Sequence, residues 1–420
     1  MSWWRTERRA DLGLFALALA LRLAWVGYIE ARGGELTQPD AHSYEALATN
    51  FLRSKGLQKQ DYAGLFADGR PSLTVRSFRP PLLPLVMAGI YALVGHAHAA
   101  VRVAMAVLSA ATCVVVARMA RRVFDASTGT LAGAGMAIYP KFIYYSGGLV
   151  TETLCTLLLA ASVATLLAAR RAGGASWRWA AGGVLLGLGT LSRSSLLLFP
   201  AAAALWVLVV CRPGRRAAGQ AGLVLAGFVV AMAPWWVRNW RVHGHFVPAT
   251  TEGGYTLWVT NNPRATGGGH CPMPQRRPEF DGLNEYQVDR LFFRKGLRHI
   301  REHPGHFLEL AGAKFVRFWR LWPHAEHVGL GAAVVGGLSF VPVLALAVWG
   351  AARSLGRWRP LLLFYAVVAY FTLVHVVFMA VTRYRVPMTP YLIVLAAWGL
   401  SDLWRRLGRR SAHRIRRTDA

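Results

Sequence analysis

The chain has 420 residues, of which 54% are hydrophobic and only 16% are charged, and this is more apolar surface than one soluble core can bury. The composition therefore excludes a soluble globular domain and predicts an all-α polytopic membrane protein. The formal net charge of +28 would favour a nucleic-acid partner in a soluble chain, but here the basic residues lie mostly between apolar segments, which excludes nucleic acid. Cys113, Cys155 and Cys211 lie in apolar segments and Cys271 in a polar loop, a spacing that predicts neither a disulfide framework nor a metal site.

The first apolar segment, residues 12–29, follows a basic start and is interrupted by Arg22. It is longer than a signal-peptide core and no small-residue cleavage site follows it, so we expect a retained anchor. Further spans are expected at residues 99–119, 128–147, 153–169, 180–191, 196–211, 221–236, 329–350, 361–380 and 388–403. Together these segments predict about ten transmembrane helices, within limits of about nine and twelve, in a single unit over residues 1–420.

Basic clusters orient the spans. They follow alternate apolar segments, for example at Arg121 and Arg122, and placing all of them in the cytoplasm puts both termini inside. Residues 81–95 must then form a re-entrant or interfacial helix rather than a span. Two segments face outward, 30–98 and 238–327, the second with amphipathic helices, and residues 405–420 form a basic cytoplasmic tail that binds lipid headgroups.

Polar residues that interrupt the apolar sequence gather on the outer face in this topology. Asp40 follows the first span, and Glu152 opens the fourth. The others are Arg79, Arg193, Arg238, Arg383 and Arg385, with His42, Tyr44, Lys141 and Asn239.

Each of these residues also has an ordinary structural explanation. A terminal arginine reaches headgroups, a first-turn carboxylate such as Glu152 complements the helix dipole, Lys141 pairs with Glu152 or reaches outward, and Asp40 is a solvated loop residue. Those explanations do not predict several outward-facing arginines beside two carboxylates, so the clustering indicates a functional site.

The residue types suit displacement of a phosphate from carbon. Arginine binds phosphate oxygens with a planar fork and stays charged, which makes a bound phosphate a better leaving group. A partly desolvated carboxylate becomes more basic, so Asp40 is expected to take a proton from the incoming hydroxyl.

At this point the sequence resembles a known family, the bacterial members of glycosyltransferase family 39 in the GT-C superfamily, which are related to protein mannosyltransferases and aminoarabinose lipid A transferases. The resemblance covers nearly the whole chain. It is carried by the ordered segments PDAHSYEALATNFLRSKGL, FRPPLLPLVMAGIYALVG, YPKFIYYSGGLVTETL, GLGTLSRSSLLL, APWWVRNWRVHGHFVPATTEGGYTLWVTNNP, HPGHFLELAGAKFVRFW and RYRVPMTPYLIVLAAWGL.

The resemblance implies an inverting hexosyl- or pentosyltransferase of the bacterial inner membrane. Its donor is a polyprenyl monophosphate sugar, without an obligatory cofactor or metal, and its acceptor is a cell-envelope glycan, lipid or protein on the periplasmic face. Asp40 maps onto the catalytic base and Arg79 onto the ligand of the lipid phosphate. Glu152 maps onto a cavity acid that we expect to assist catalysis, and Arg193, Arg238 and Arg383 map onto further cavity arginines that we assign to the donor phosphate. His42, Tyr44, Lys141, Asn239 and Arg385 are expected to support the cavity.

Two departures limit the resemblance. Asp40 is followed by Ala41 where protein mannosyltransferases have a second acid, and a large C-terminal outer domain is absent from this sequence. Both argue against a eukaryote-like protein mannosyltransferase and leave the acceptor open. Candidate acceptor contacts in the second outer segment are Asn261, Asn262, His270 and Asp281.

Three alternatives remain open. A transporter or flippase of lipid-linked sugars would also need arginines, although it more often shows matching halves and polar groups at mid-membrane. A diphosphate-dependent O-antigen ligase or polymerase would use a different donor. A non-catalytic lipid-binding subunit would tolerate Asp40→Asn.

Overall fold

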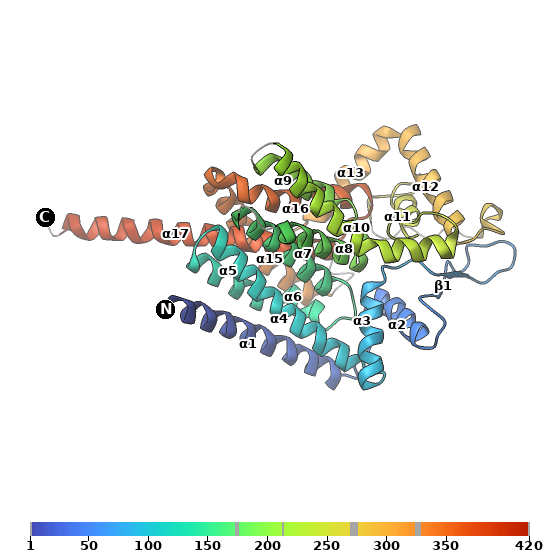
Figure 1. The fold of residues 1–420 in the computed structure, drawn as a ribbon, viewed down its shortest axis with the longest axis horizontal. Helices are drawn as coiled ribbons and strands as arrows, with labels where there is room; N and C mark the ends of the chain where they lie inside the picture. Colours follow the sequence, from blue (N-terminus) through green and yellow to red (C-terminus); the bar gives the residue numbers. More distant parts are fainter. Residues whose placement is uncertain (1, 173–175, 212–213, 269–275, 324–328, 419–420) are drawn as a thin grey trace.

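The computed structural model describes residues 2–172, 176–211, 214–268, 276–323 and 329–418. His270 and Cys271 lie outside the described residues, as do the side chains of the basic tail from residue 408 onward. Both chain termini lie at one end of the helical bundle, and we call this the terminal end (Figure 1). The other end, which we call the loop end, carries α2, α3, α11, α12 and the β1 strand (Figure 1).

Long apolar helices build the bundle. Within the described residues, 7 helices are long and apolar enough to cross a membrane, so the protein is a multi-pass membrane protein. They correspond to α1 (Ser2–Ala31), α4 (His98–Val123), α7 (Glu152–Ala172), α10 (Arg215–His243), α15 (Leu330–Arg353), α16 (Trp358–Val377) and α17 (Thr389–Thr418). Shorter helices pack among them: α5 (Ala126–Ile138), α8 (Ser176–Ser192) and α9 (Phe199–Val210).

One expected span is broken. Residues 128–147 form α5 and then α6 (Pro140–Ser146), with Tyr139 extended between them at φ −67° and ψ 118°. Pro140 has no N–H to continue α5 and disfavours the helical conformation of the residue before it. The prediction of one continuous helix is therefore wrong, although the proline was visible in the sequence.

The arginine that interrupts the first apolar segment joins three helices. Arg22 of α1 is fully buried and donates to Ser109 Oγ of α4 at 2.7 Å. It also donates to the carbonyl oxygens of Met136 and Ala137 of α5 at 3.2 and 3.0 Å. These bonds satisfy a buried charge that would otherwise be costly in an apolar bundle.

Close backbone contacts fix α8 against α10. A Cβ on Gly183 of α8 would lie 2.0 Å from the carbonyl oxygen of Val224, and a Cβ on Gly227 of α10 would lie 2.1 Å from that of Ala180. Glycine at both places lets the helices touch, which is the usual way that apolar helices associate within a membrane.

The loop end consists of short elements between the spans. They are α2 (Pro39–Leu52), β1 (Lys59–Asp61), β2 (Leu73–Val75), α3 (Leu82–Val94), η1 (Ser194–Leu196), α11 (Gly253–Thr260), η2 (Pro278–Phe280), α12 (Glu285–Glu302), α13 (Pro304–Trp319) and η4 (Thr382–Met388), while η3 (Leu355–Arg357) precedes α16. The strands pair antiparallel, a small ribbon that the sequence did not predict. The 13 residues of α3 span roughly 20 Å, too short to cross a bilayer core of about 30 Å.

Candidate active site

A cavity of about 370 Å³ opens at the loop end, where several chain segments meet. Asp40 enters it from the first turn of α2, and Arg79 from the segment before α3. Arg193 follows α8, and Glu252 precedes α11. Proline at the start of α2 and the carboxylate in its first turn both favour a helix beginning at this point, so local sequence fixes where Asp40 stands.

Alternating charges form one continuous chain of ion pairs at this cavity. Arg79 donates to Glu252 Oε1 and to Asp40 Oδ1, both at 2.8 Å. Arg383 then donates to Asp40 Oδ2 at 2.9 Å and to both oxygens of Glu152 at 2.5 and 3.0 Å. The chain ends with Arg193, which donates to Glu152 Oε1 at 2.9 Å. Three arginines thus balance three carboxylates, with both oxygens of Asp40 bound.

Glu152 is the most deeply buried member of this ion-pair chain. Asp40, Arg79, Arg193 and Glu252 line the cavity, whereas Glu152 and Arg383 are not among its lining residues. The Glu152 side chain has 0% exposure, while that of Asp40 has 26%. Glu152 therefore supports the wall of the cavity from behind, and Asp40 and Glu252 are the carboxylates of the ion-pair chain that face the cavity.

The pKa of Asp40 lies below its ordinary value. Burial alone raises this pKa, but the positive charges of Arg79, Arg383 and Arg193 lower it by more. The expectation that desolvation makes Asp40 more basic is therefore wrong for this arrangement. The carboxylate stays ionised at neutral pH.

Two guanidinium groups at the cavity hold unused donors. The Nε atoms of Arg79 and Arg193 are buried and have no hydrogen-bond partner among the described residues. A buried donor without a partner is costly. Both guanidinium groups belong to residues that line the cavity, and a guanidinium group is well suited to bind an anion. Aromatic rings lie next to both arginines. The guanidinium carbon of Arg193 is 4.5 Å from the ring centroid of Tyr384, and that of Arg79 is 5.8 Å from the ring centroid of Tyr44.

Arg238 and Asn239 lie outside the lining of the cavity. Arg238 of α10 donates to Ser77 Oγ at 2.7 Å, and Ser77 Oγ donates to the buried Asn239 Oδ1 at 2.9 Å. These contacts connect α10 to the segment that leads to Arg79. Their position supports a structural role and does not support the predicted phosphate contact of Arg238.

The remaining predicted residues also differ in position. Lys141 donates to the carbonyl oxygen of Thr382 at 3.2 Å and so supports the segment that carries Arg383. His42 is exposed and bonds the carbonyl of Leu36 at 2.9 Å. Of these predicted supporting residues, only Tyr44 is among the lining residues.

Arg385 does not join the site, although it is only two residues from Arg383. The segment is a 3-10 helix, η4, in which residues two apart point about 120° from each other. Arg385 is buried and lies 3.9 Å from the ring centroid of Phe340 in α15. Arg385 therefore does not support the cavity as predicted, whereas Arg383 reaches Asp40.

The candidate acceptor residues between positions 238 and 327 hold the loops together. Asn261 is buried and accepts from Lys314 Nζ at 2.7 Å, and Asn262 Oδ1 accepts from the Arg264 N–H at 2.8 Å. Asp281 accepts from the N–H groups of residues 67 and 68 at 2.8 and 3.0 Å. None of the three is among the lining residues of the cavity in the described part of the chain.

Sequence reasoning missed Glu252. It lies in the quoted segment PATTEGGY, next to a pair of glycines, and no ionisable neighbour in the sequence marks it as a partner of Arg79. Burial raises the pKa of this carboxyl group, and the charge of Arg79 offsets part of that rise. An acid in a loop is a weak signal by itself, and only the fold brings it 2.8 Å from Arg79.

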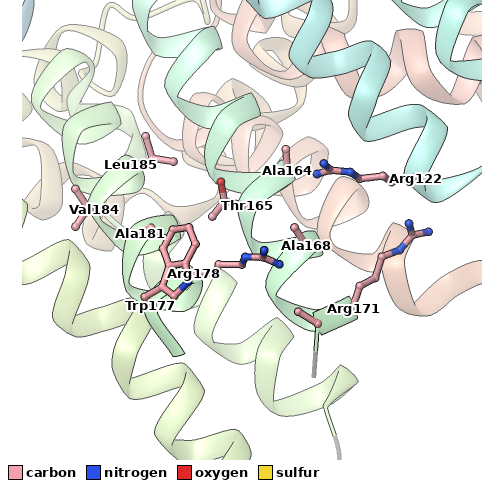
Figure 2. Close-up of a pocket in the computed structure, with 11 residues that line it drawn as sticks. Arg122, Ala164, Thr165, Ala168, Arg171, Trp177, Arg178, Ala181, Val184 and Leu185 are labelled. Atoms are coloured by element: carbon pink, nitrogen blue, oxygen red, sulfur yellow. The ribbon is translucent and has the colours of Figure 1, made fainter. Parts of the chain in front are cut away.

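A second hollow, of about 970 Å³, lies between the C-terminal half of α7 and the N-terminal part of α8 (Figure 2). It is lined by Arg122, Ala164, Thr165, Ala168, Arg171, Ala172, Trp177, Arg178, Ala181, Val184 and Leu185. None of these described lining residues carries a carboxylate or a nucleophilic thiol. The smaller cavity, with its ion-pair chain, is therefore the candidate active site.

Comparison with known proteins agrees with this assignment of the fold. Residues 78–237 match the family model described as dolichyl-phosphate-mannose-protein mannosyltransferase, a stretch that includes Arg79, Glu152 and Arg193. No curated protein sequence matches the chain at a significant level.

Two solved structures resemble the whole chain. The archaeal oligosaccharyltransferase AglB from Archaeoglobus fulgidus, in complex with an inhibitory peptide and a dolichol-phosphate, matches with a TM-score of 0.57 at 14% identity, over 96% of this chain and 51% of that chain. ArnT from Cupriavidus metallidurans, bound to undecaprenyl phosphate, matches with a TM-score of 0.54 at 18% identity, over 95% of this chain and 60% of that chain. This chain thus spans only 51% to 60% of the length of these two neighbours. It has the GT-C fold of these structures, as the resemblance in its sequence predicts, and the family model matches its residues 78–237.

Proposed function

We propose that the protein is a membrane glycosyltransferase that moves a sugar from a polyprenyl monophosphate donor to a hydroxyl group of a cell-envelope acceptor. One observation carries this proposal: at the cavity, an ionised Asp40 stands beside two arginines that each keep an unused Nε donor. A base next to a phosphate-binding pair is what displacement of phosphate from the sugar carbon requires.

The proposed reaction is a single displacement. One oxygen of Asp40 takes the proton of the acceptor hydroxyl while that hydroxyl oxygen bonds to the anomeric carbon. The bond between this carbon and the phosphate oxygen breaks, and its electron pair leaves on the phosphate. Arg79 and Arg193 stabilise the charge that develops there. Each Asp40 oxygen already accepts one bond from an arginine and keeps a further lone pair for the proton.

The inner members of the ion-pair chain position the base. Arg383 binds Asp40 on one side and Glu152 on the other, and Glu152 also receives Arg193. Glu152 has no exposure through which to reach a substrate. We therefore assign Glu152 to positioning rather than to direct contact with the reacting atoms, and we assign Arg383 to positioning Asp40 because it donates to both carboxylates.

Donor binding is expected to raise the basicity of Asp40. The arginines that lower its pKa would share their positive charge with a bound phosphate, so the net field at the carboxylate would weaken. The base would then reach its working strength only when the donor is present.

The proposed location is the bacterial inner membrane, with both termini in the cytoplasm and the loop end facing the periplasm. Arginines at the ends of three spans support this orientation, because basic residues favour the cytoplasmic side of a membrane. The last turns of α4, α7 and α15 contain Arg122, Arg171 and Arg353. The donor phosphate would then lie at the outer membrane surface, beside the cavity.

The test is transfer of a radiolabelled sugar from synthetic polyprenyl-phosphate donors to a membrane-glycan extract. Asp40→Asn should abolish transfer, whereas His42→Ala, an exposed change on the same helix, should retain it. Thermal unfolding of both variants checks that each is folded. Transfer by Asp40→Asn at the wild-type rate would remove Asp40 from the mechanism. Transfer from diphosphate-linked donors alone would indicate a ligase, and binding without transfer would indicate a transporter or a lipid-binding subunit.

A further inference from the structure

A second polar cluster lies at the loop end and takes no part in the ion-pair chain. It consists of Glu45, His96 and His98, whose ligand-type atoms all lie within 4.8 Å of one another. Glu45 Oε1 is 2.8 Å from His96 Nε2 and also accepts from Thr49 Oγ1 at 2.9 Å. Two imidazoles and one carboxylate are therefore gathered at one point.

The fold brings these residues together from distant positions. Glu45 lies on α2, five residues after Asp40, whereas the histidines flank the start of α4. Gly95 ends α3 with a φ of 82°, a conformation that glycine adopts without strain, and the resulting turn places His96 beside α2. Sequence spacing alone does not reveal such a trio.

The state of His98 is an independent observation. Its Nε2 atom is buried and has no hydrogen-bond partner among the residues that the structure describes. A buried ring nitrogen without a partner is unfavourable unless something else satisfies it. The rings are held from one side by Tyr91, whose centroid lies 4.7 Å from that of His96 and 6.4 Å from that of His98.

We propose that Glu45, His96 and His98 bind one divalent transition-metal ion of the Zn²⁺ class, with Nε2 of His98 as one ligand. Two imidazoles and a carboxylate form a ligand set that this class prefers, with water in the fourth position. Ligands of one Zn²⁺ at about 2.0–2.1 Å lie roughly 3.3 Å apart. The ligand-type atoms of the trio lie within 4.8 Å of one another, with Glu45 and His96 2.8 Å apart, so binding needs only a small rearrangement. His96 can supply that movement because 53% of its side chain is exposed.

The ion would connect α2 to the start of α4. Since α2 carries Asp40 in its first turn, the bound metal would fix the helix that positions the proposed base. The ion takes no part in the transfer reaction, and the inference stands independently of the proposed function.

Metal binding to the full-length, tag-free protein in detergent tests the proposal. Metals are first removed with a chelator, and the wild type is then loaded with Zn²⁺ and dialysed. It should retain one Zn²⁺ per chain after dialysis. The melting temperature of the metal-free protein should rise when Zn²⁺ is added. Glu45→Gln and His96→Asn should each weaken Zn²⁺ binding by at least about tenfold and lose most of this rise. Both variants should melt like the metal-free wild type before Zn²⁺ is added, which shows that they fold.

A second histidine group supplies the matched control. His299, His303 and His306 also approach one another at the loop end, with His299 Nε2 3.1 Å from His306 Nδ1. His299→Asn should leave Zn²⁺ binding unchanged. Loss of binding in His299→Asn with retention in His96→Asn would overturn the proposal, as would a wild type that retains no Zn²⁺. With Co²⁺ as the probe, the wild type should show the visible absorption of a tetrahedral site, and His96→Asn should not.

Discussion

Arg383 donates from Nη1 to Oδ2 of Asp40 at 2.9 Å, although the two residues are 343 positions apart in the chain. The same guanidinium binds both oxygens of Glu152. The last part of the bundle therefore holds the carboxylate that α2 presents. This arrangement predicts how a substitution of Arg383 would affect activity.

Replacement of Arg383 by lysine should impair the chemical step more than donor binding. Lysine keeps the charge but loses the planar fork that engages Asp40 and Glu152 together. We expect kcat to fall by at least about tenfold, equivalent to about 1.4 kcal/mol, while the donor KM stays within about threefold. Steady-state kinetics measure both constants. A raised KM with unchanged kcat would instead make Arg383 a ligand of the donor. Arg385→Lys makes the same chemical change on the other side of η4 and is the control.

Replacement of Arg79 or Arg193 should weaken donor binding. Each lines the cavity and keeps an unpartnered Nε, so glutamine there removes charge and fork geometry together. We expect the apparent Kd for polyprenyl phosphate to rise by about tenfold or more in either variant, measured by equilibrium binding. Arg238→Gln, whose arginine faces Ser77, should bind the lipid like the wild type. An equal loss in all three variants would indicate a general electrostatic effect.

The pH profile should show the influence of the arginines on Asp40. The pKa of the carboxyl group is depressed, so the base is active above this pKa and activity falls as the pH drops through it. Arg79→Gln removes one of the charges that lower the pKa while burial, which raises it, remains. The acid limb of kcat/KM should therefore move to higher pH in this variant. An acid limb that stays in place would show that another group controls it.

Glu252 binds Arg79, the arginine that we propose binds the donor phosphate, so we expect the two anions to compete. Because Glu252→Gln removes the competing negative charge and keeps a hydrogen-bonding side chain of similar size, Arg79 should become freer to bind an anion. We expect the donor KM to fall by roughly twofold to fivefold, with kcat unchanged or lower. Steady-state kinetics with a fixed acceptor concentration measure this change. A raised KM would mean that Glu252 orients Arg79 rather than competing with its ligand.

Much of the architecture could be predicted because membrane helices are long and apolar. The positions of the long apolar helices along the chain follow from hydropathy. The clustering of charged residues also predicted that Asp40, Arg79, Arg193 and Arg383 form one site. Charged residues at membrane depth are costly, so a cluster of them indicates a functional site. The structure brings those four residues together.

The failures have physical causes. Arg385 was assigned to the cavity because the sequence does not reveal that η4 is a 3-10 helix, in which alternate residues diverge. Glu252 was missed because its only distinguishing feature is its ion pair with Arg79, which lies 173 positions away in the sequence. The direction of the Asp40 pKa depends on a balance between burial and three arginines, and composition cannot weigh that balance.

The contact between α8 and α10 gives a prediction about stability. A Cβ on Gly227 would lie 2.1 Å from the carbonyl oxygen of Ala180, which is backbone and cannot rotate away. Gly227→Ala should therefore separate the helices and destabilise the protein by about 1–3 kcal/mol, the usual cost of overpacking. Gly222→Ala is the control on the same helix, because no heavy atom lies within 4 Å of its Cβ position. Thermal unfolding in detergent should show a lowered melting temperature for Gly227→Ala alone. Since α10 ends near Arg238 and thus near the segment before Arg79, transfer activity should fall in the same variant. Equal melting temperatures for the two variants would mean that the helices are not in backbone contact.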